Sequence, residues 1–178
     1  MSADLQDLAP IRLLQKGVNV APLQALLDAQ PELWDENRFR TEAAYGGPHA
    51  KLSDIIVRFN DWGNWTGDRA AFNEEHESVW WGPYDKLPYL QPLVFDLMRM
   101  FYAERLGMVL LTRIPPHTNC EPHVDVGWHA EHYLKFAVQV KAAPGQRFCY
   151  EGYSLETETG DLFAFDNSKP HWVENPTD

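Results

Sequence analysis

Basic residues, cysteines and long hydrophobic runs are all scarce in this sequence of 178 residues. Lys and Arg together number 15 against 26 Asp and Glu, which gives a net charge of −11. Nucleic-acid binding relies on clustered positive charge, so no nucleic-acid partner is expected. The acidic balance instead favours a monomer or weak oligomer that acts on a cationic or neutral small molecule.

Signals for membrane insertion and secretion are also missing. No apolar run approaches the roughly 18 residues of a membrane-spanning helix, and the start of the chain lacks the basic and apolar stretches of a signal peptide. Cys120 and Cys149 are too few for a disulfide scaffold. We therefore expect a cytoplasmic protein with reduced cysteines and no membrane partner.

The remaining composition is sufficient for one folded domain, 1–178, because 44% of the residues are hydrophobic. Residues 1–107 are predicted to form a mixed layer of strands and helices, including a helix at 88–106 in which apolar residues recur at helical spacing. From 108 to 178, short apolar segments alternate with turns, which is typical of a β-sandwich or jelly-roll barrel. The predicted fold is mainly β with an N-terminal helical support layer.

Three residues form a metal-binding pattern in the C-terminal part. His123 and Asp125 lie two positions apart, and His171 follows 48 positions after His123. Residues two apart in an extended strand point to the same side, so both can reach one ion, and His171 must then come from a strand that folds back alongside. Two imidazoles and one carboxylate form the facial triad of non-heme Fe(II) oxygenases. We predict these three residues as metal ligands and as the catalytic centre.

The sequence around the three residues resembles the aspartyl/asparaginyl β-hydroxylase family. The matching stretches read TRIPPHTNCEPHVD at 112–125 and FCYEGYSLETETGDLFAFDNSKPHWVEN at 148–175. The most specific part is the arrangement Gly-x-Leu-x-x-Phe-Asp-x-Ser-x-x-His that ends at His171. This resemblance implies a double-stranded β-helix, a jelly-roll or cupin-like fold, that carries an Fe(II)- and 2-oxoglutarate-dependent dioxygenase using O2.

The resemblance also implies cofactor contacts. Asp125 supplies a carboxylate where some members have glycine, so the triad is complete. Thr112 falls where the family places a hydroxyl group that contacts the 2-oxoglutarate carboxylate, and His132 falls near a strand position where members carry a basic residue facing the pocket. The family's 2-oxoglutarate clamp is an Arg on the strand after the second His, and we expect the sequence to be truncated before it. Without that Arg, Lys135 is the candidate cation; the other interpretation is a solvated strand lysine.

Aromatic residues in two loops are candidates for substrate contact. They are Trp128 and His129 in the predicted loop at 126–131, and the Trp80–Trp81 pair in the aromatic acidic segment at 61–84. The alternative is that these side chains only pack the loops onto the barrel.

The predicted activity is hydroxylation of an amino acid, or of an aspartyl- or asparaginyl-type residue in a peptide or protein. The small size of the chain, with no added peptide-binding domain, favours a small amino-acid-like substrate or a short peptide. The alternative is a cupin-like module that binds metal without catalysis.

Overall fold

The computed structural model describes residues 9–177. It contains 27% strand and 24% helix, and its sheets are antiparallel, which confirms the prediction of a mainly β protein. None of the helices in this described range is long and apolar enough to cross a membrane.

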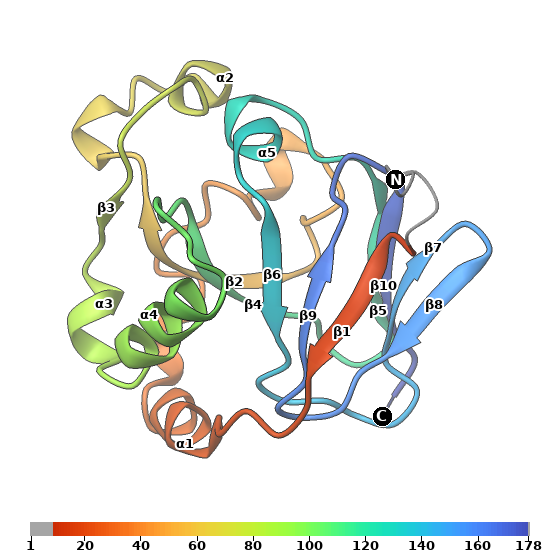
Figure 1. The fold of residues 1–178 in the computed structure, drawn as a ribbon. Coiled ribbons are helices and arrows are strands. Elements are labelled where there is room, and N and C mark those ends of the chain that lie inside the picture. Colours follow the sequence, from red (N-terminus) through yellow and green to blue (C-terminus); the bar gives the residue numbers. More distant parts are fainter. Residues whose placement is uncertain (1–8, 178) are drawn as a thin grey trace, which may run out of the picture.

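Short strands and helices alternate along the chain (Figure 1). The strands are β1 (Ile11–Gln15), β2 (Ser53–Phe59), β3 (Val79–Trp80), β4 (Val109–Arg113), β5 (Thr118–His123), β6 (Lys135–Val138), β7 (Arg147–Tyr150), β8 (Tyr153–Glu156), β9 (Leu162–Phe165) and β10 (His171–Asn175). The α-helices are α1 (Ala21–Ala29), α2 (Arg69–Phe72), α3 (Pro83–Lys86), α4 (Leu90–Met100) and α5 (Trp128–His132). Three 3-10 helices are η2 (Pro31–Leu33), η3 (Ala43–Tyr45) and η4 (Trp62–Asn64).

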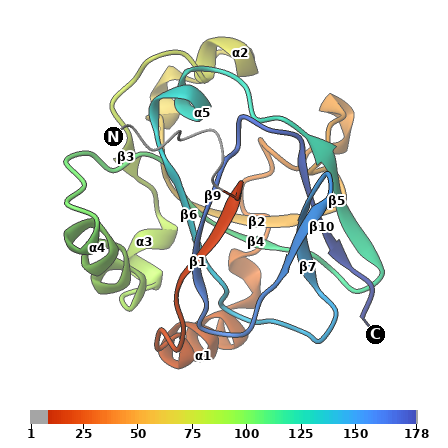
Figure 2. The same ribbon diagram turned by 45° about the vertical axis from the view of Figure 1, so that its right-hand side comes forward.

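The strands form three sheets, with the orders β1-β9-β6, β5-β10-β7-β8 and β3-β2-β4. The first two sheets lie together in Figures 1 and 2 and share a core in which Ile11 of β1, Tyr150 of β7 and Phe163 of β9 pack against one another. Strand β1 pairs with β9, so the N-terminal segment contributes a strand to a sheet of the C-terminal part.

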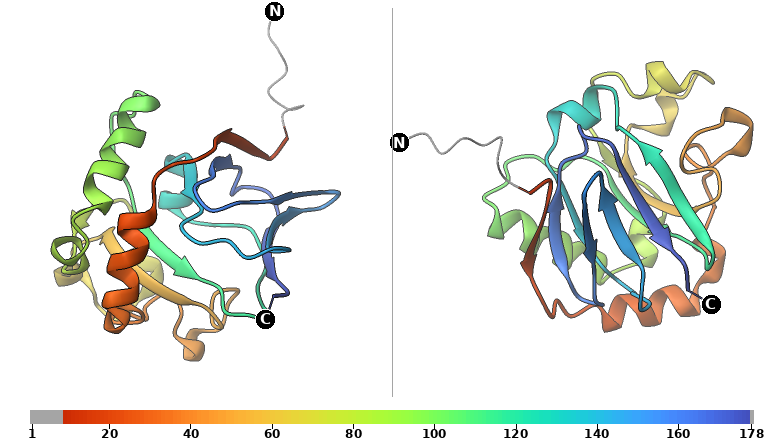
Figure 3. Two further views of the ribbon diagram at one scale, coloured as in Figure 1. Left: turned by 90° about the horizontal axis from the view of Figure 1, so that it is seen from below. Right: turned by 90° about the vertical axis from the view of Figure 1, so that its right-hand side faces the viewer.

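The helical layer packs on one face of the β3-β2-β4 sheet. Leu23 of α1 and Leu90 of α4 share a buried cluster with Ile55 and Val57 of β2. Ile56 belongs to a different, aromatic cluster, because successive side chains of a strand point to opposite faces. Figure 3, left, shows α1 and α4 on one side of the molecule and β7 and β8 on the opposite side.

Two predicted boundaries are wrong. Helix α4 ends at Met100, short of 106, because Tyr102 adopts a left-handed backbone conformation with φ of 52°. Most of the predicted loop at 126–131 is helix α5, which begins after Gly127 and ends at His132. A helix of five residues is too short to show a helical pattern of apolar residues in the sequence.

Candidate metal centre

Strands β5 and β10 bring the two predicted histidine ligands together. The strands are antiparallel neighbours, and their register places His171 opposite His123. The two ring centroids lie 4.4 Å apart. Ligand atoms of His123, Asp125 and His171 all lie within 4.8 Å of one another. The prediction that the distant histidine comes from a strand folded back beside His123 is therefore confirmed.

Asp125 reaches the same place by a different route from the predicted one. Strand β5 ends at His123, so Asp125 is not a strand residue. Its backbone N–H instead donates to the carbonyl of Asn167, at 3.1 Å, in the turn before β10. Its carboxylate Oδ1 lies 3.5 Å from Nε2 of His123. A backbone hydrogen bond between two loops therefore positions the carboxylate. The alternation of side chains along a strand does not.

Backbone carbonyls orient both imidazole rings. Nδ1 of His123 lies 2.7 Å from the Glu121 carbonyl, and Nδ1 of His171 lies 2.9 Å from the Lys169 carbonyl. A carbonyl only accepts hydrogen bonds, so each Nδ1 carries a proton and each Nε2 is the atom left for a metal or a second proton. Hydrogen bonds of this kind orient histidine ligands in metal sites.

The three groups are electrostatically coupled. Burial opposes charge on His123, but its hydrogen bonds to Asp125, Cys120 and the Glu121 carbonyl raise its pKa to about 10. Burial likewise opposes charge on Asp125, yet the two histidines lower the pKa of its carboxyl group. Burial is the main cause of the lowered pKa of His171. Two imidazole nitrogens and one ionised carboxylate are a donor set that fits Fe(II) and leaves coordination positions open.

Lys135 interacts electrostatically with Asp125 of this centre. Its Nζ donates to the carbonyl of His129 at 3.3 Å. Burial lowers the pKa of Lys135, while the charge of Asp125 opposes that shift. The lysine is therefore a partly desolvated cation beside the triad, which argues against the interpretation of a solvated strand lysine.

Thr112 belongs to a network with a second cation that sequence reasoning missed. Arg40 donates from Nε to Asp54 Oδ2 at 2.6 Å and from Nη2 to Thr112 Oγ1 at 2.8 Å. Thr112 in turn donates its hydroxyl proton to Asp54 Oδ1 at 2.8 Å. Its predicted contact with 2-oxoglutarate stays a prediction, and it requires that proton to change partners. No local motif links Arg40 to Asp54, so only the fold reveals the pair.

His132 and His129 lie in different environments: His132 is exposed and His129 is buried. The prediction that His132 lies on a strand is wrong, because it ends the helix α5, where its exposed ring stacks on Trp128 at a centroid distance of 5.0 Å. Its cofactor contact stays a prediction. His129 is buried, with Nε2 3.3 Å from the hydroxyl of Ser78 and its ring 5.2 Å from that of Phe59. Burial, together with nearby Lys135, lowers the pKa of His129 to about 3, as in a neutral core histidine.

The Trp80–Trp81 pair has well-defined packing partners. Trp80 stacks on Tyr84 at a centroid distance of 4.4 Å, and the Trp81 indole donates to the Asn60 carbonyl at 3.0 Å. The pairing of Trp80 with Arg58 and of Val79 with Phe59 holds this segment against β2. Substrate contact by these residues or by Trp128 stays a prediction.

A comparison of the chain with models of protein families finds no match, and a comparison with curated proteins finds none either.

Proposed function

We propose that the protein is a cytoplasmic Fe(II)- and 2-oxoglutarate-dependent dioxygenase that hydroxylates an amino acid, or an aspartyl- or asparaginyl-type residue in a peptide or protein. The observation that carries the proposal is the convergence of His123, Asp125 and His171, with ligand atoms within 4.8 Å of one another. The resemblance of the surrounding sequence to aspartyl/asparaginyl β-hydroxylases supplies the reaction class. The free thiols of Cys120 and Cys149 agree with a reducing compartment.

The strand arrangement supports the double-stranded β-helix as the scaffold. In that proposal, the sheet β5-β10-β7-β8 is one wall, and the sheet β1-β9-β6 packs against it. The metal ligands come from the end of β5, from the turn that follows it and from the start of β10. The side chains of His123 and Asp125 are 13% and 29% exposed, so solvent reaches the centre.

The protein residues have distinct tasks in this proposal. His123 and His171 present Nε2 lone pairs, and Asp125 adds one negative charge, so the donor set neutralises half the charge of a divalent ion. Bound Fe(II), with 2-oxoglutarate and O2, would supply the oxidising power for C–H hydroxylation, with succinate and CO2 as the other products. Lys135 is suited to pair with a carboxylate of the cosubstrate, because Arg40 is already neutralised by Asp54.

Succinate release tests the proposal. The full chain, loaded with Fe(II) under anaerobic conditions, would be given 2-oxoglutarate and O2 with a panel of amino acids and short peptides. We expect succinate in amounts that match a hydroxylated product, no turnover for His123→Ala, and normal turnover for His117→Asn, which alters an exposed histidine. Metal binding without succinate in any condition would contradict the proposal and favour the non-catalytic cupin-like module.

A further inference from the structure

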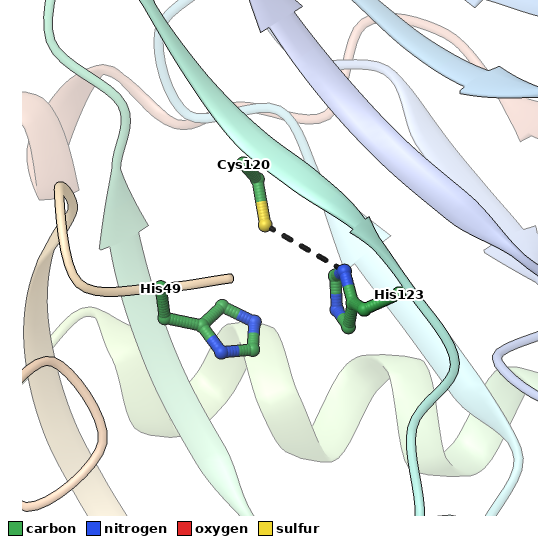
Figure 4. A group of neighbouring side chains, drawn as sticks. All are labelled: His49, Cys120 and His123. Carbon is green, nitrogen blue, oxygen red and sulfur yellow. Dashed lines mark hydrogen bonds between the residues drawn. The ribbon is translucent and has the colours of Figure 1, made fainter. Parts of the chain in front are cut away.

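A second group of metal-binding side chains adjoins the triad and shares one residue with it. We call His49, Cys120 and His123 the Cys120 cluster; their ligand atoms also lie within 4.8 Å of one another. Figure 4 shows the three side chains turned toward a common space, with the sulfur of Cys120 directed at the His123 ring. The Cys120 Sγ and His123 Nδ1 atoms are 4.0 Å apart.

A bulge in β5 places Cys120 and His123 on the same side. Residues three apart in a regular strand point to opposite faces. Here the pairing with β10 shifts, so that His123 faces His171 whereas Cys120 faces Val173. Between these two pairs, β5 therefore contains one residue more than β10, which is a β-bulge. Pro122 lies in this bulge and has no N–H to donate to the neighbouring strand. The bulge turns the thiol toward the imidazole.

His49 is held against β5 by a backbone hydrogen bond on one side of it and by an ion pair between side chains on the other. The N–H of Glu121 donates to the carbonyl of Pro48 at 3.3 Å, and Lys51 pairs with the Glu121 side chain at 3.0 Å. These contacts place the His49 ring 4.8 Å from that of His123, edge to face. Cys120 itself is only 5% exposed, and His49 and His123 are half-buried.

The donor set of the Cys120 cluster differs from that of the triad in its chemistry. One sulfur and two imidazole nitrogens suit Zn²⁺ and other thiophilic ions, whereas the nitrogen and carboxylate donors of the triad suit Fe(II). We infer that the Cys120 cluster is a second metal site, which binds one thiophilic divalent cation through Cys120, His49 and Nδ1 of His123. The ion replaces the thiol proton and the Nδ1 proton of His123, and both protons pass to solvent.

The shared imidazole makes the two sites alternatives. A neutral imidazole has one nitrogen lone pair and one N–H. Metal at Nδ1 requires His123 to release its hydrogen bond to the Glu121 carbonyl and to carry its proton on Nε2, where Asp125 can accept it. The triad then lacks one ligand. A thiophilic ion in the Cys120 cluster therefore excludes an ion from the triad, whatever reaction the triad performs.

Cd²⁺ is a direct probe, because a thiolate bound to Cd²⁺ absorbs in the ultraviolet. Metal-free full-length chain would be titrated with Cd²⁺ in four forms: the natural sequence, Cys120→Ser, Asp125→Ala and Cys149→Ser. Cys149 is the matched control, since it is also free and buried. We expect one saturating thiolate band per chain in all forms except Cys120→Ser. No band in the natural sequence, a band that persists in Cys120→Ser, or a band lost in Cys149→Ser would overturn the inference.

Two further measurements test the roles of His49 and His123. His49→Ala should weaken Cd²⁺ binding at least tenfold. If Cys120→Ser does not fold, this variant tests the second metal site in its place. Unchanged Cd²⁺ affinity would show that His49 is not a ligand. Mn²⁺ prefers the donors of the triad to those of the Cys120 cluster. Its electron paramagnetic resonance signal therefore shows whether binding at one site affects binding at the other, as the shared His123 requires. Cd²⁺ should release bound Mn²⁺ from the natural sequence and fail to do so in Cys120→Ser. Simultaneous binding of both ions would contradict the shared ligand.

Discussion

Nε2 of His123 lies 3.5 Å from Oδ1 of Asp125, and the two groups stabilise each other's charged forms. The pair occupies the position where two metal ligands would converge. In the metal-free protein, a proton on His123 therefore takes the place of the ion. Metal binding exchanges one cation for another at this point and leaves the hydrogen bond of His123 Nδ1 to the Glu121 carbonyl in place.

Metal binding should consequently release a proton from His123. The group is protonated at neutral pH, because its hydrogen bonds, despite burial, raise its pKa to about 10. An ion must displace that proton, so Mn²⁺ affinity should rise by about tenfold per pH unit from neutral pH and level off near the pKa of His123. Calorimetry in two buffers of different ionisation enthalpy would count the protons. Asp125→Asn should bind Mn²⁺ more weakly and with less proton release, and equal release in both proteins would contradict this origin of the raised pKa.

Lys135→Ala should weaken 2-oxoglutarate binding and leave metal affinity nearly unchanged. A hydrogen bond to a charged group contributes about 1.5–3 kcal/mol, so the dissociation constant should rise roughly 10- to 100-fold. Equilibrium binding of 2-oxoglutarate to the Mn²⁺-loaded protein measures the effect. Lys141→Ala is the control, because Lys141 is exposed. Equal affinities in the two variants would exclude Lys135 as the cosubstrate's cation.

Asp54→Ala should destabilise the fold strongly. The Asp54 side chain is fully buried and that of Arg40 is 18% exposed, so removing the carboxylate leaves a buried guanidinium without its ion-pair partner. Such a loss typically costs about 3–5 kcal/mol in the free energy of unfolding. Urea denaturation measures it. Glu158→Ala, which breaks an exposed ion pair with Lys16, is the control and should leave the urea midpoint unchanged. Equal midpoints for the natural sequence, Asp54→Ala and Glu158→Ala would show that the buried pair is dispensable.

Gly107→Ala should destabilise the packing around His129. A Cβ atom at Gly107 would lie 2.7 Å from Cε1 of His129 and 2.9 Å from Cδ2 of Tyr133. Overpacking of this kind typically costs about 1–3 kcal/mol. Gly82→Ala is the matched control, because no atom beyond its chain neighbours lies within 4 Å of its added Cβ. In thermal denaturation, Gly107→Ala should unfold at a lower temperature than Gly82→Ala. Equal unfolding temperatures would show that the side chains of His129 and Tyr133 move to accommodate the added methyl group.

Sequence patterns were sufficient to predict that His123, Asp125 and His171 lie together, and insufficient to predict the residues around them. The short strands around His123 and His171 follow from turn residues and apolar segments, so the pairing of β5 with β10 could be anticipated. The role of Cys120 depends on a bulge, and that of His49 depends on a loop lying against β5. Neither has a periodic signature. Helix α5 was missed for a related reason, since one short turn of helix has no repeat to detect.

We propose that His123, Asp125 and His171 hold an Fe(II) ion whose open positions accept 2-oxoglutarate. Anaerobic titration of the Fe(II)-loaded protein with 2-oxoglutarate, followed by visible absorption, tests it most directly, because a cosubstrate that chelates Fe(II) through its keto and carboxylate oxygens produces a charge-transfer band. We expect a band that saturates at one cosubstrate per chain in the natural sequence and in His117→Asn, and no band in His171→Ala. No band in the natural sequence, or an undiminished band in His171→Ala, would contradict it.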